Sequence, residues 1–288
     1  MSYLDKVNRC NACDLSKYTP FVVGDIQVGW LTGARAQVVL QYPEVFVESA
    51  AGIAMAPGLS TAEDRTNALA GVAPQLVSSG LFRPGTGEMY GVKNQWREPA
   101  LLHMDRMLVP AFGARAYGVH LNGWLVKDGA PYLWIGTRAA DRIVEPGKLD
   151  NMVAGGQPAA LSLTENLIKE AGEEAGLSAD LARTARAVSV ISYCFETANG
   201  LRNDTLFCYD LDVPDDVMPR NTDGEISGFE LMALPEILAL VRDTERFKFN
   251  VNLVIIDFAL RHGALTAENT PDYEKIAAGL RRWPQPMV

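Results

Sequence analysis

Three glutamates on one short stretch of expected helix constrain this chain more than any other feature. At about 100° per residue, Glu170, Glu173 and Glu174 project within about 100° of one another. Carboxylates crowded in this way repel one another unless cations lie between them. Oxygen ligands at such spacing suit Mg²⁺ or Mn²⁺, which bind through a few carboxylates and keep several waters. The sequence therefore predicts a divalent-metal site on this helix face.

The limits of that helix can be read from its ends. Ser162 followed by Glu165 is a capping-box pattern, and Gly176 is a common C-terminal cap. Gly155-Gly156 precedes the helix, where the backbone can approach a metal or a phosphate closely. A solvated acidic helix face is the alternative interpretation, and the glycine pair weakens it. The opposite face, which we expect to meet a core, carries Ile168, Ala171, Gly172 and Ala175.

Length and charge narrow the classes of protein. With 288 residues, 48% of them hydrophobic, the chain can bury a sizeable core and form about one to two domains. A net charge of −9 argues against nucleic-acid binding, which favours a basic surface, but is compatible with a metal-mediated contact to one phosphorylated small molecule. No apolar run approaches the roughly 18 residues of a membrane-spanning helix, and the polar segment 1–19 lacks a signal-peptide stretch. We therefore expect a cytoplasmic protein that binds no membrane.

The apolar pattern predicts two parts, with a boundary between residues 113 and 114. Residues 1–113 are interpreted as a small α/β domain with several short strands in 21–54. Two helices are expected after those strands, at 61–79 and 98–112. We expect this domain either to complete a substrate pocket or to form the interface of a homodimer.

Residues 114–288 mix strands and helices. Lys127–Pro131 has the composition of a hairpin turn. The acidic helix lies within the set of strands, and three further helices close the chain. This order predicts a mixed α/β (α+β) layered domain. The expected strands are 116–126, 132–138, 187–197, 204–211 and 225–231, and the expected closing helices are 235–242, 250–262 and 272–281.

Residues 155–177 resemble the Nudix box, whose pattern is G-x5-E-x7-R-E-U-x-E-E-x-G-U, with U a bulky aliphatic residue. Three positions depart from it: Leu161 replaces the first Glu, Lys169 replaces Arg, and Ala171 is smaller than usual. In Nudix enzymes that Glu and Arg are commonly structural partners, and here Glu165 is expected to pair with Lys169 instead. The matching residues are Gly155, Glu170, Glu173, Glu174, Gly176 and Leu177.

The resemblance extends over nearly the whole chain, which is similar to one Nudix subfamily. That subfamily carries an N-terminal domain of formerly unknown function and is related to the Nudix part of fungal thiamine pyrophosphokinase fusions. It implies a Nudix fold, a mixed sheet sandwiched between helices, preceded by a small α/β domain. The segments that carry the resemblance are 118–124, 146–156, 223–225, 247–250 and 255–263.

The resemblance implies a Mg²⁺-dependent pyrophosphohydrolase that cuts a small-molecule diphosphate. The expected substrate is thiamine diphosphate, or its oxo and oxy damaged analogues, cut to the monophosphate and phosphate. Two alternatives stay open. One is a nucleoside-diphosphate substrate such as ADP-ribose, and the other is a non-catalytic metabolite-binding module, which Leu161 motivates. In the enzyme, Glu170, Glu173 and Glu174 together with Gly155 would hold Mg²⁺ or Mn²⁺.

Several residues outside the helix are candidates for the rest of the site. Glu225 in Asp223-Gly224-Glu225 is expected to act as a metal ligand or base, and an ordinary solvated turn is its alternative. Stacking of an aromatic ring would suit a flat cationic group. The candidates for binding substrate, each with an ordinary structural role as alternative, are Lys148 and Arg138 for phosphate, His120 and Asn122 for the organic half, and Trp30 for stacking.

Two remaining features are expected to be structural. Cys10 and Cys13 form a C-x2-C pair that would be half of a zinc site, but no second half follows, so we favour four reduced thiols. Asp257 and Arg261 are spaced to form a salt bridge along a helix.

Overall fold

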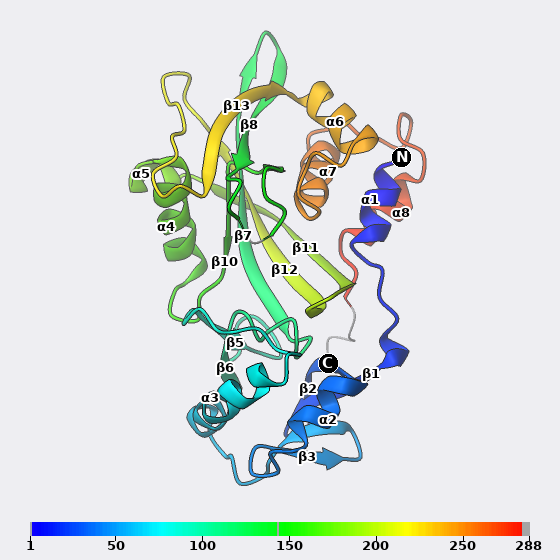
Figure 1. Cartoon of the computed structure of the whole chain (residues 1–288). Helices are drawn as coiled ribbons and strands as arrows, with labels where there is room; N and C mark the ends of the chain where they lie inside the picture. The colour runs from blue at the N-terminus through cyan, green and yellow to red at the C-terminus, as the bar shows by residue number, and fades with distance from the viewer. Residues whose placement is uncertain (1, 143, 284–288) are drawn as a thin grey trace.

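A mixed sheet of seven strands organises the C-terminal part of the chain (Figure 1). The computed structural model describes residues 2–142 and 144–283. The strands are β7 (Arg115–Lys127), β8 (Ala130–Arg138), β9 (Leu149–Asp150), β10 (Val153–Gly156), β11 (Arg186–Thr197), β12 (Gly200–Asp212) and β13 (Ile226–Ala233). Their order is β11-β12-β7-β8-β13, with β10 paired to β7 and β9 paired to β8. Only the β12–β7 pair is parallel within these described strands, so the sheet is mixed.

Helices cover both faces of this sheet (Figure 1). One face meets α4 (Leu163–Ala175) and α5 (Ala179–Ala182), whose apolar residues share a core with Val119 and Leu121 of β7. The other face meets α6 (Leu234–Asp243), α7 (Val251–Arg261), α8 (Tyr273–Gly279) and the N-terminal α1 (Tyr3–Arg9). The expectation of a mixed sheet sandwiched between helices is therefore confirmed.

Strand β7 is buried on both faces. Val119 and Leu121 pack toward α4, whereas His120 and Asn122 alternate to the side of α7 and are also buried. Because strand side chains alternate, one strand supplies an apolar core to one face and a polar layer to the other. The hairpin to β8 turns at Asp128 and Gly129, both with positive φ (52° and 75°), as a tight two-residue turn requires.

The N-terminal part has a separate four-stranded sheet of order β2-β1-β4-β3 and a two-stranded sheet. Its core is centred on Phe21, Phe46 and Phe112, whose rings contact one another. The elements are β1 (Tyr18–Val23), β2 (Ile26–Thr32), α2 (Gly33–Val39), β3 (Phe46–Ser49), β4 (Gly52–Met55), α3 (Ala62–Ser78), β5 (Met89–Val92) and β6 (Leu102–Asp105). A short 3-10 turn, Leu15–Lys17, leads into this part.

The expected helix at 98–112 was wrong. Residues 102–105 form β6, which pairs antiparallel with β5, and the rest of the segment consists of turns. Leu102 and Met104 are buried while His103 and Asp105 are not, which is the two-residue alternation of a strand. Pairing with the strand at 89–92 therefore decided the structure of residues 102–105, although their apolar spacing also suited a helix. Within 21–54, one helix, α2, also interrupts the expected strands, because Thr32 caps it.

The first helix, α1, packs on the C-terminal part rather than on the N-terminal sheet (Figure 1). Val7 and Cys10 belong to the core that also contains Val254 and Phe258 of α7. The start of β7 at Arg115 agrees with a division between residues 113 and 114, but the assignment of all of 1–113 to one domain stays a prediction. The chain thus crosses from one part to the other twice.

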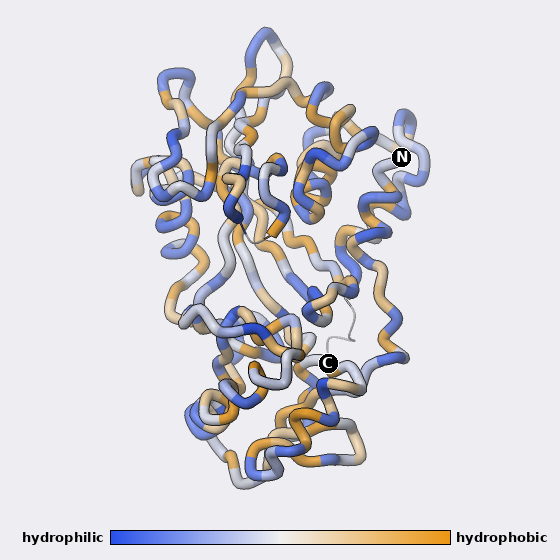
Figure 2. The backbone as a smooth tube through the Cα atoms, viewed as in Figure 1, coloured by the Kyte–Doolittle hydropathy of each residue, from blue (hydrophilic) through white to orange (hydrophobic). Residues whose placement is uncertain are grey.

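Hydropathy along the chain follows this packing. The loop between β12 and β13 is mostly hydrophilic, and apolar residues concentrate in the strands and in α7 (Figure 2). In the described part of the chain, no helix combines the length and the apolar character needed to cross a membrane.

Candidate active site

The ends of α4 set the rotation of the acidic residues. Ser162 Oγ accepts from the N–H of Glu165, and the carboxylate of Glu165 accepts from the N–H of Ser162, so the predicted capping box is confirmed. Gly176 closes the helix in the left-handed conformation with φ 63°. The helix packs against β10, the strand that begins two residues after Asn151.

Glu170 lies directly against the backbone of β10. A Cβ added at Gly155 would overlap the Cγ of Glu170, so only glycine allows the carboxylate to lie this close to the strand. Burial raises the pKa of Glu170; Lys169 partly offsets the rise, while the charges of Glu173 and Glu225 add to it. Glu170 therefore lies in negative surroundings beside a glycine, as a metal ligand would.

Glu174 lies one turn further along α4 and is buried, with 5% of its surface exposed. Its Oε2 accepts from the N–H of Ala154 at 2.8 Å. Burial raises the pKa of Glu174 well above its usual value; the Ala154 N–H opposes this, and the charges of Asp150 and Glu170 increase it. The buried Glu174 and the half-buried Glu170 thus both resist ionisation, which a divalent cation would reverse.

The free edge of β10 offers a ligand that sequence reasoning missed. Ala154 N–H points away from β7, because it donates to Glu174, and in an antiparallel ladder the carbonyl of the same residue points the same way. The carbonyl of Gly155 points instead toward Gly118 of β7. The backbone oxygen best placed beside the carboxylates therefore belongs to Ala154, not to the predicted Gly155. Only the strand pairing decides which of two adjacent carbonyls faces outward.

Glu173 is held at the surface by Lys169. The ammonium of Lys169 lies 2.6 Å from Glu173 and 3.2 Å from Glu170. The expected Lys169–Glu165 pair was wrong, because the capping box already uses the Glu165 carboxylate. Lys169, which stands where the Nudix pattern has arginine, therefore pairs with two of the carboxylates predicted to bind metal.

Glu225 lies close enough for its charge to act on Glu170. Its backbone N–H donates to Asp223 in the tight turn before β13, and its carboxylate pairs with Arg142 at 2.6 Å. The charge of Glu225 thus acts on Glu170 while its carboxylate pairs with Arg142, and its role as metal ligand or base stays a prediction.

The donor set fits a hard divalent cation only partly in this arrangement. Among residues 2–142 and 144–283, no three acidic, histidine or cysteine side chains converge on one point that would hold a metal. Glu170, Glu174 and the Ala154 carbonyl form the less exposed half of such a site. Glu173 and Glu225 would complete it once they exchange Lys169 and Arg142 for the cation.

A buried polar layer lies on the α7 side of the sheet. His120 Nδ1 lies 2.8 Å from Asn151 Oδ1, and Asn151 Nδ2 donates to Asn122 Oδ1 at 2.8 Å. Asn122 in turn donates to Asp210 at 3.0 Å. Burial, followed by the charge of Lys248, lowers the pKa of His120 to about 4, so this imidazole is neutral near pH 7. The predicted residues His120 and Asn122 are thus held by other side chains.

Arg138 and Lys148 both bind protein groups. Arg138 donates to Asp150 at 2.7 Å and to the carbonyls of Val144 and Glu145. Lys148 pairs with Glu145 at 3.3 Å. These contacts favour a positioning role for Arg138, and the role of either residue in binding phosphate stays a prediction.

Trp30 lies apart from the carboxylates. It belongs to β2 of the N-terminal sheet, where its backbone N–H donates to the carbonyl of Phe112 and its backbone lies against Gly113. The structure does not bring it to Glu170. Tyr90, also from the N-terminal part, is better placed, because its hydroxyl occupies the space that a side chain at Gly156 would need.

Two residues to which the sequence gave no role, Lys248 and Arg106, join the site region. Lys248 bonds to Asp150 at 3.1 Å, and its charge reaches Glu174. Arg106 carries a raised pKa, because the charges of Tyr90, Glu88 and Glu225 outweigh its burial. Both residues lie far along the chain from the groups they meet, and for Arg106 contact between the two parts of the chain brings it near Glu225.

The remaining predictions concern structural residues. Arg261 and Asp257 form the predicted salt bridge at 2.8 Å. Cys10 is buried against the carbonyl of Phe249. A hydrogen bond between the thiols of Cys13 and Cys194, which remain free cysteines, lowers the pKa of Cys13 to about 7. The two thiols of the C-x2-C pair therefore face different neighbours.

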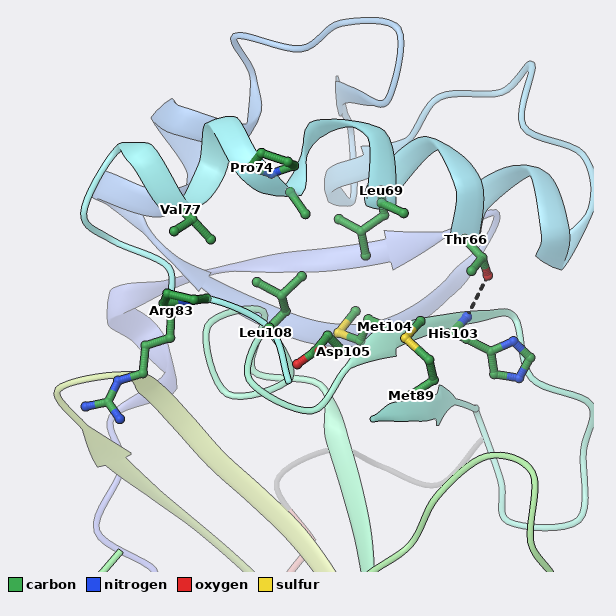
Figure 3. A pocket seen from close by; sticks show the side chains of 14 residues that line it. Thr66, Leu69, Pro74, Val77, Arg83, Met89, His103, Met104, Asp105 and Leu108 are labelled. Atoms are coloured by element: carbon green, nitrogen blue, oxygen red, sulfur yellow. Dashed lines mark hydrogen bonds between the residues drawn. The ribbon is translucent and has the colours of Figure 1, made fainter. Parts of the chain in front are cut away.

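An apolar cavity of about 430 Å³ lies in the N-terminal part. Figure 3 shows Leu69 and Val77 of α3 facing Met104 and Leu108 across it, with the guanidinium of Arg83 turned outward. None of the predicted site residues lines this cavity, so it is separate from the acidic cluster.

Comparison with known proteins places the chain in a family. Residues 2–116 match a family described as a domain of unknown function (DUF4743). The chain is 38% identical over 283 residues to Nudix hydrolase 24, chloroplastic, of Arabidopsis thaliana, covering 97% of this chain and 77% of that protein. It is 36% identical over 279 residues to Nudix hydrolase 20, chloroplastic, of the same plant, covering 93% and 75%. The solved structure of DR0079 from Deinococcus radiodurans is similar over 49% of this chain and 82% of that one, with 22% identity and a TM-score of 0.38. Identity at the level of the two plant proteins, over nearly the whole length, shows that this chain belongs to the Nudix hydrolase family.

Proposed function

We propose that this Nudix hydrolase is a Mg²⁺- or Mn²⁺-dependent pyrophosphohydrolase acting at the free edge of β10. One observation carries the proposal: the buried Glu174 and the half-buried Glu170, both with raised pKa values, lie along this edge beside the glycine pair. A bound divalent cation would neutralise the diphosphate and supply an activated water.

The residues around this edge would have different roles in the reaction. Glu170, Glu174 and the Ala154 carbonyl would hold the cation, with Gly155 leaving room for it. Glu173 and Glu225, the two acidic side chains at the surface of the cluster, are candidates for a further ligand and for the base that takes a proton from water. The released Lys169 and Arg142 would then lie beside the entering phosphate groups, where cations favour its negative charge.

The substrate we favour is thiamine diphosphate or an oxo or oxy damaged form of it, cut to the monophosphate and phosphate. The family resemblance of the whole chain supports it. Acidic and aromatic side chains also lie on the α7 side, where Asp204 accepts from Tyr193 and Phe195 packs on Phe249. A link to fungal thiamine pyrophosphokinase fusions belongs to the same proposal.

Two other functions remain as outcomes of the test. A nucleoside-diphosphate compound such as ADP-ribose would need the same metal site with another pocket. A non-catalytic binding module is favoured by Leu161 at the position of the first Glu and by the pairing of Lys169 with Glu173. The compounds that the protein hydrolyses, or the lack of any hydrolysis, would distinguish these two functions from the proposed one.

The decisive experiment measures phosphate release from a panel containing thiamine diphosphate, its oxo analogue and ADP-ribose, with Mg²⁺, with Mn²⁺ and with a chelator. We expect metal-dependent turnover that favours the thiamine compounds. Glu63→Gln, an exposed substitution on α3, is the matched control for Glu174→Gln. Turnover of ADP-ribose alone would replace the substrate, and ligand binding without any turnover would establish the binding module.

Partners and compartment are proposals as well. We propose a small-molecule diphosphate as the binding partner, with neither nucleic acid nor membrane, and a homodimer as the candidate assembly. A cytoplasmic location also stays a prediction, since the two plant relatives are named chloroplastic.

A further inference from the structure

A second cavity, of about 300 Å³, lies where the N-terminal part meets the loop that leads into α4. One wall is the segment 91–97, which begins in β5 and continues beyond its end, and the other is the loop 157–162. Figure 1 shows β5 lying beside the start of α4. The acidic cluster is further along the same helix: Glu170 lies eight residues beyond Ser162, or about 12 Å at 1.5 Å per residue. The cavity is therefore distinct from the proposed metal site.

Backbone hydrogen bonds hold both walls in place. Ala159 N–H donates to the carbonyl of Met89 at 2.8 Å, which joins the loop to β5. Gln157 N–H donates to the carbonyl of Tyr117 at 2.9 Å, which joins the same loop to β7. The cavity is thus built between two ordered segments and does not depend on a mobile loop.

Aromatic rings form one side of the cavity. The indole of Trp96 contacts the rings of Tyr117 and Phe207 at centroid distances of 4.9 and 5.0 Å. The ammonium of Lys93 lies 4.6 Å from the centre of the Trp96 ring and donates to the Trp96 carbonyl at 3.2 Å. These contacts hold the positive charge of Lys93 at the cavity wall.

The charge of the cavity is positive although the chain carries −9. Lys93 and Arg97 both line it, and within residues 2–142 and 144–283 neither forms a salt bridge with an acidic group. The acidic residues that the structure describes near the cavity do not pair with Lys93 or Arg97. Glu165 accepts a hydrogen bond in the capping box, and Glu98 lies near enough to Tyr117 for its charge to act on that residue. Two unneutralised cations beside the N-terminus of a 13-residue helix favour an anion.

Gln157 adds a second, independent requirement. Its side chain lines the cavity and only 5% of the residue is exposed, yet its Oε1 has no hydrogen-bond partner. The amide nitrogen donates to the carbonyls of Pro158 and Leu161 at 3.1 and 2.7 Å, which fixes the orientation of the amide. A buried acceptor without a partner costs free energy, and a donor from a molecule bound in the cavity would satisfy it.

We propose that this cavity binds a small organic anion that also carries hydroxyl or amino groups, with a sugar phosphate as its model. Lys93 and Arg97 bind the anionic group, and the Oε1 of Gln157 accepts a hydrogen bond from a donor of the same molecule. The volume suits a compact ligand at the lower end of small-molecule pockets. This site is separate from the hydrolytic one and does not depend on which diphosphate is cut.

The test is a calorimetric titration of the full-length protein in the presence of EDTA, so that no metal-mediated binding contributes. Ribose 5-phosphate should bind at least about tenfold more tightly than ribose, which lacks the anion, and than inorganic phosphate, which lacks the carbon-borne hydroxyls. Gluconate, a hydroxylated carboxylate, distinguishes a phosphate from a carboxylate as the preferred anion. Equal binding of ribose, or no binding of either organic anion in the millimolar range, overturns the proposal.

Variants locate the binding. The double substitution Lys93→Met with Arg97→Gln should weaken ribose 5-phosphate binding at least about tenfold, because charged hydrogen-bonding partners are lost. The charge-matched control, Arg83→Gln with Lys127→Met, removes two cations elsewhere and should change binding less than about twofold. Unchanged binding in the first variant, or an equal loss in the control, overturns the assignment. If the double variant does not fold, Arg97→Gln alone, at an exposed residue, gives the same test.

Discussion

Two groups of carboxylates in this molecule have opposite electrostatics. Glu170 and Glu174, at the edge of β10, lie in negative surroundings, and burial raises both pKa values. Asp150 and Asp210, in the layer under α7, also suffer burial, but cationic and hydrogen-bonding partners hold their pKa values below the usual range. Burial alone therefore does not distinguish a functional acid from a structural one; the number of positive partners does.

The partners of the structural group can be named. Asp150 bonds to Arg138 at 2.7 Å and to Lys248 at 3.1 Å. Asp210 bonds to Arg261 at 2.6 Å, with Asn122 and His262 as further partners. Around Glu174, by contrast, the one hydrogen-bond donor that the described residues supply is the backbone of Ala154. In the described part of the chain, Glu174 of the edge group therefore lacks the direct cationic partner that Asp150 and Asp210 of the layer group have. Glu170, by contrast, is contacted by Lys169 at 3.2 Å.

The largest expected effect concerns the edge group. Glu174→Gln should lower kcat/KM at least about a thousandfold, equivalent to about 4 kcal/mol of transition-state stabilisation, because a charged ligand is lost. Without metal, its free energy of unfolding should be equal to or higher than that of the wild type, because a buried charge has been removed. Phosphate release and urea denaturation measure the two effects.

Glu63→Gln on α3 is the matched control for that substitution and should change neither quantity. An active Glu174→Gln protein, within about tenfold of wild type, would remove the contrast between the two groups and with it the proposed metal site.

The second effect concerns the layer group. Asp210→Ala should lower the free energy of unfolding by about 3 kcal/mol, because Arg261 loses a buried partner and Asn122 loses an acceptor. Urea denaturation would measure it. Asp180→Ala, which removes an exposed partner of Arg183, should cost less than about 1 kcal/mol. A small loss for Asp210→Ala would mean that its ion pairs contribute little to stability.

The third effect is a dependence of stability on pH with opposite signs for the two groups. Glu170 and Glu174 bind their protons more tightly when folded, so without metal they should reduce stability as pH rises above the unfolded value of about 4.3. Asp150 and Asp210 have lowered pKa values, so their contribution is present above about 3.9 and lost as pH falls through their folded values.

Thermal unfolding with EDTA across pH 4 to 8 would separate these contributions. The fall in stability toward neutral pH should be smaller in Glu174→Gln and should be reversed by Mn²⁺ in the wild type. An unchanged pH profile in Glu174→Gln would show that this carboxyl does not resist ionisation.

The smallest expected effect concerns Lys169, which pairs with Glu170 of the edge group and with Glu173. Lys169→Met removes its contacts with Glu170 and Glu173 and should change stability by no more than about 0.5 kcal/mol, because the pair is exposed. Mn²⁺ should bind more tightly, since Glu173 is freed, as calorimetry would show. Lys275→Met, which breaks a similar exposed pair with Asp272, should leave Mn²⁺ binding unchanged. Weaker Mn²⁺ binding in Lys169→Met would mean that the lysine positions the ligands.

Local patterns predicted much of this molecule. The capping box at Ser162, the left-handed Gly176 and the hairpin at Asp128-Gly129 all appear where short-range chemistry places them. Prediction failed where a distant partner decided the outcome. Residues 98–112 form a strand and turns because β5 pairs with part of them, and Glu165 does not meet Lys169 because the helix cap already uses it.

The amino-acid sequence by itself determined that three acidic side chains share one face of a helix and that a glycine pair precedes it, because helix geometry and caps depend only on neighbours along the chain. The tertiary structure decided which carbonyl of β10 faces outward, which buried acids have cationic partners, and that Tyr90 and Arg106 reach the site region. These depend on strand pairing and on contacts between residues far apart in sequence, which no local pattern encodes.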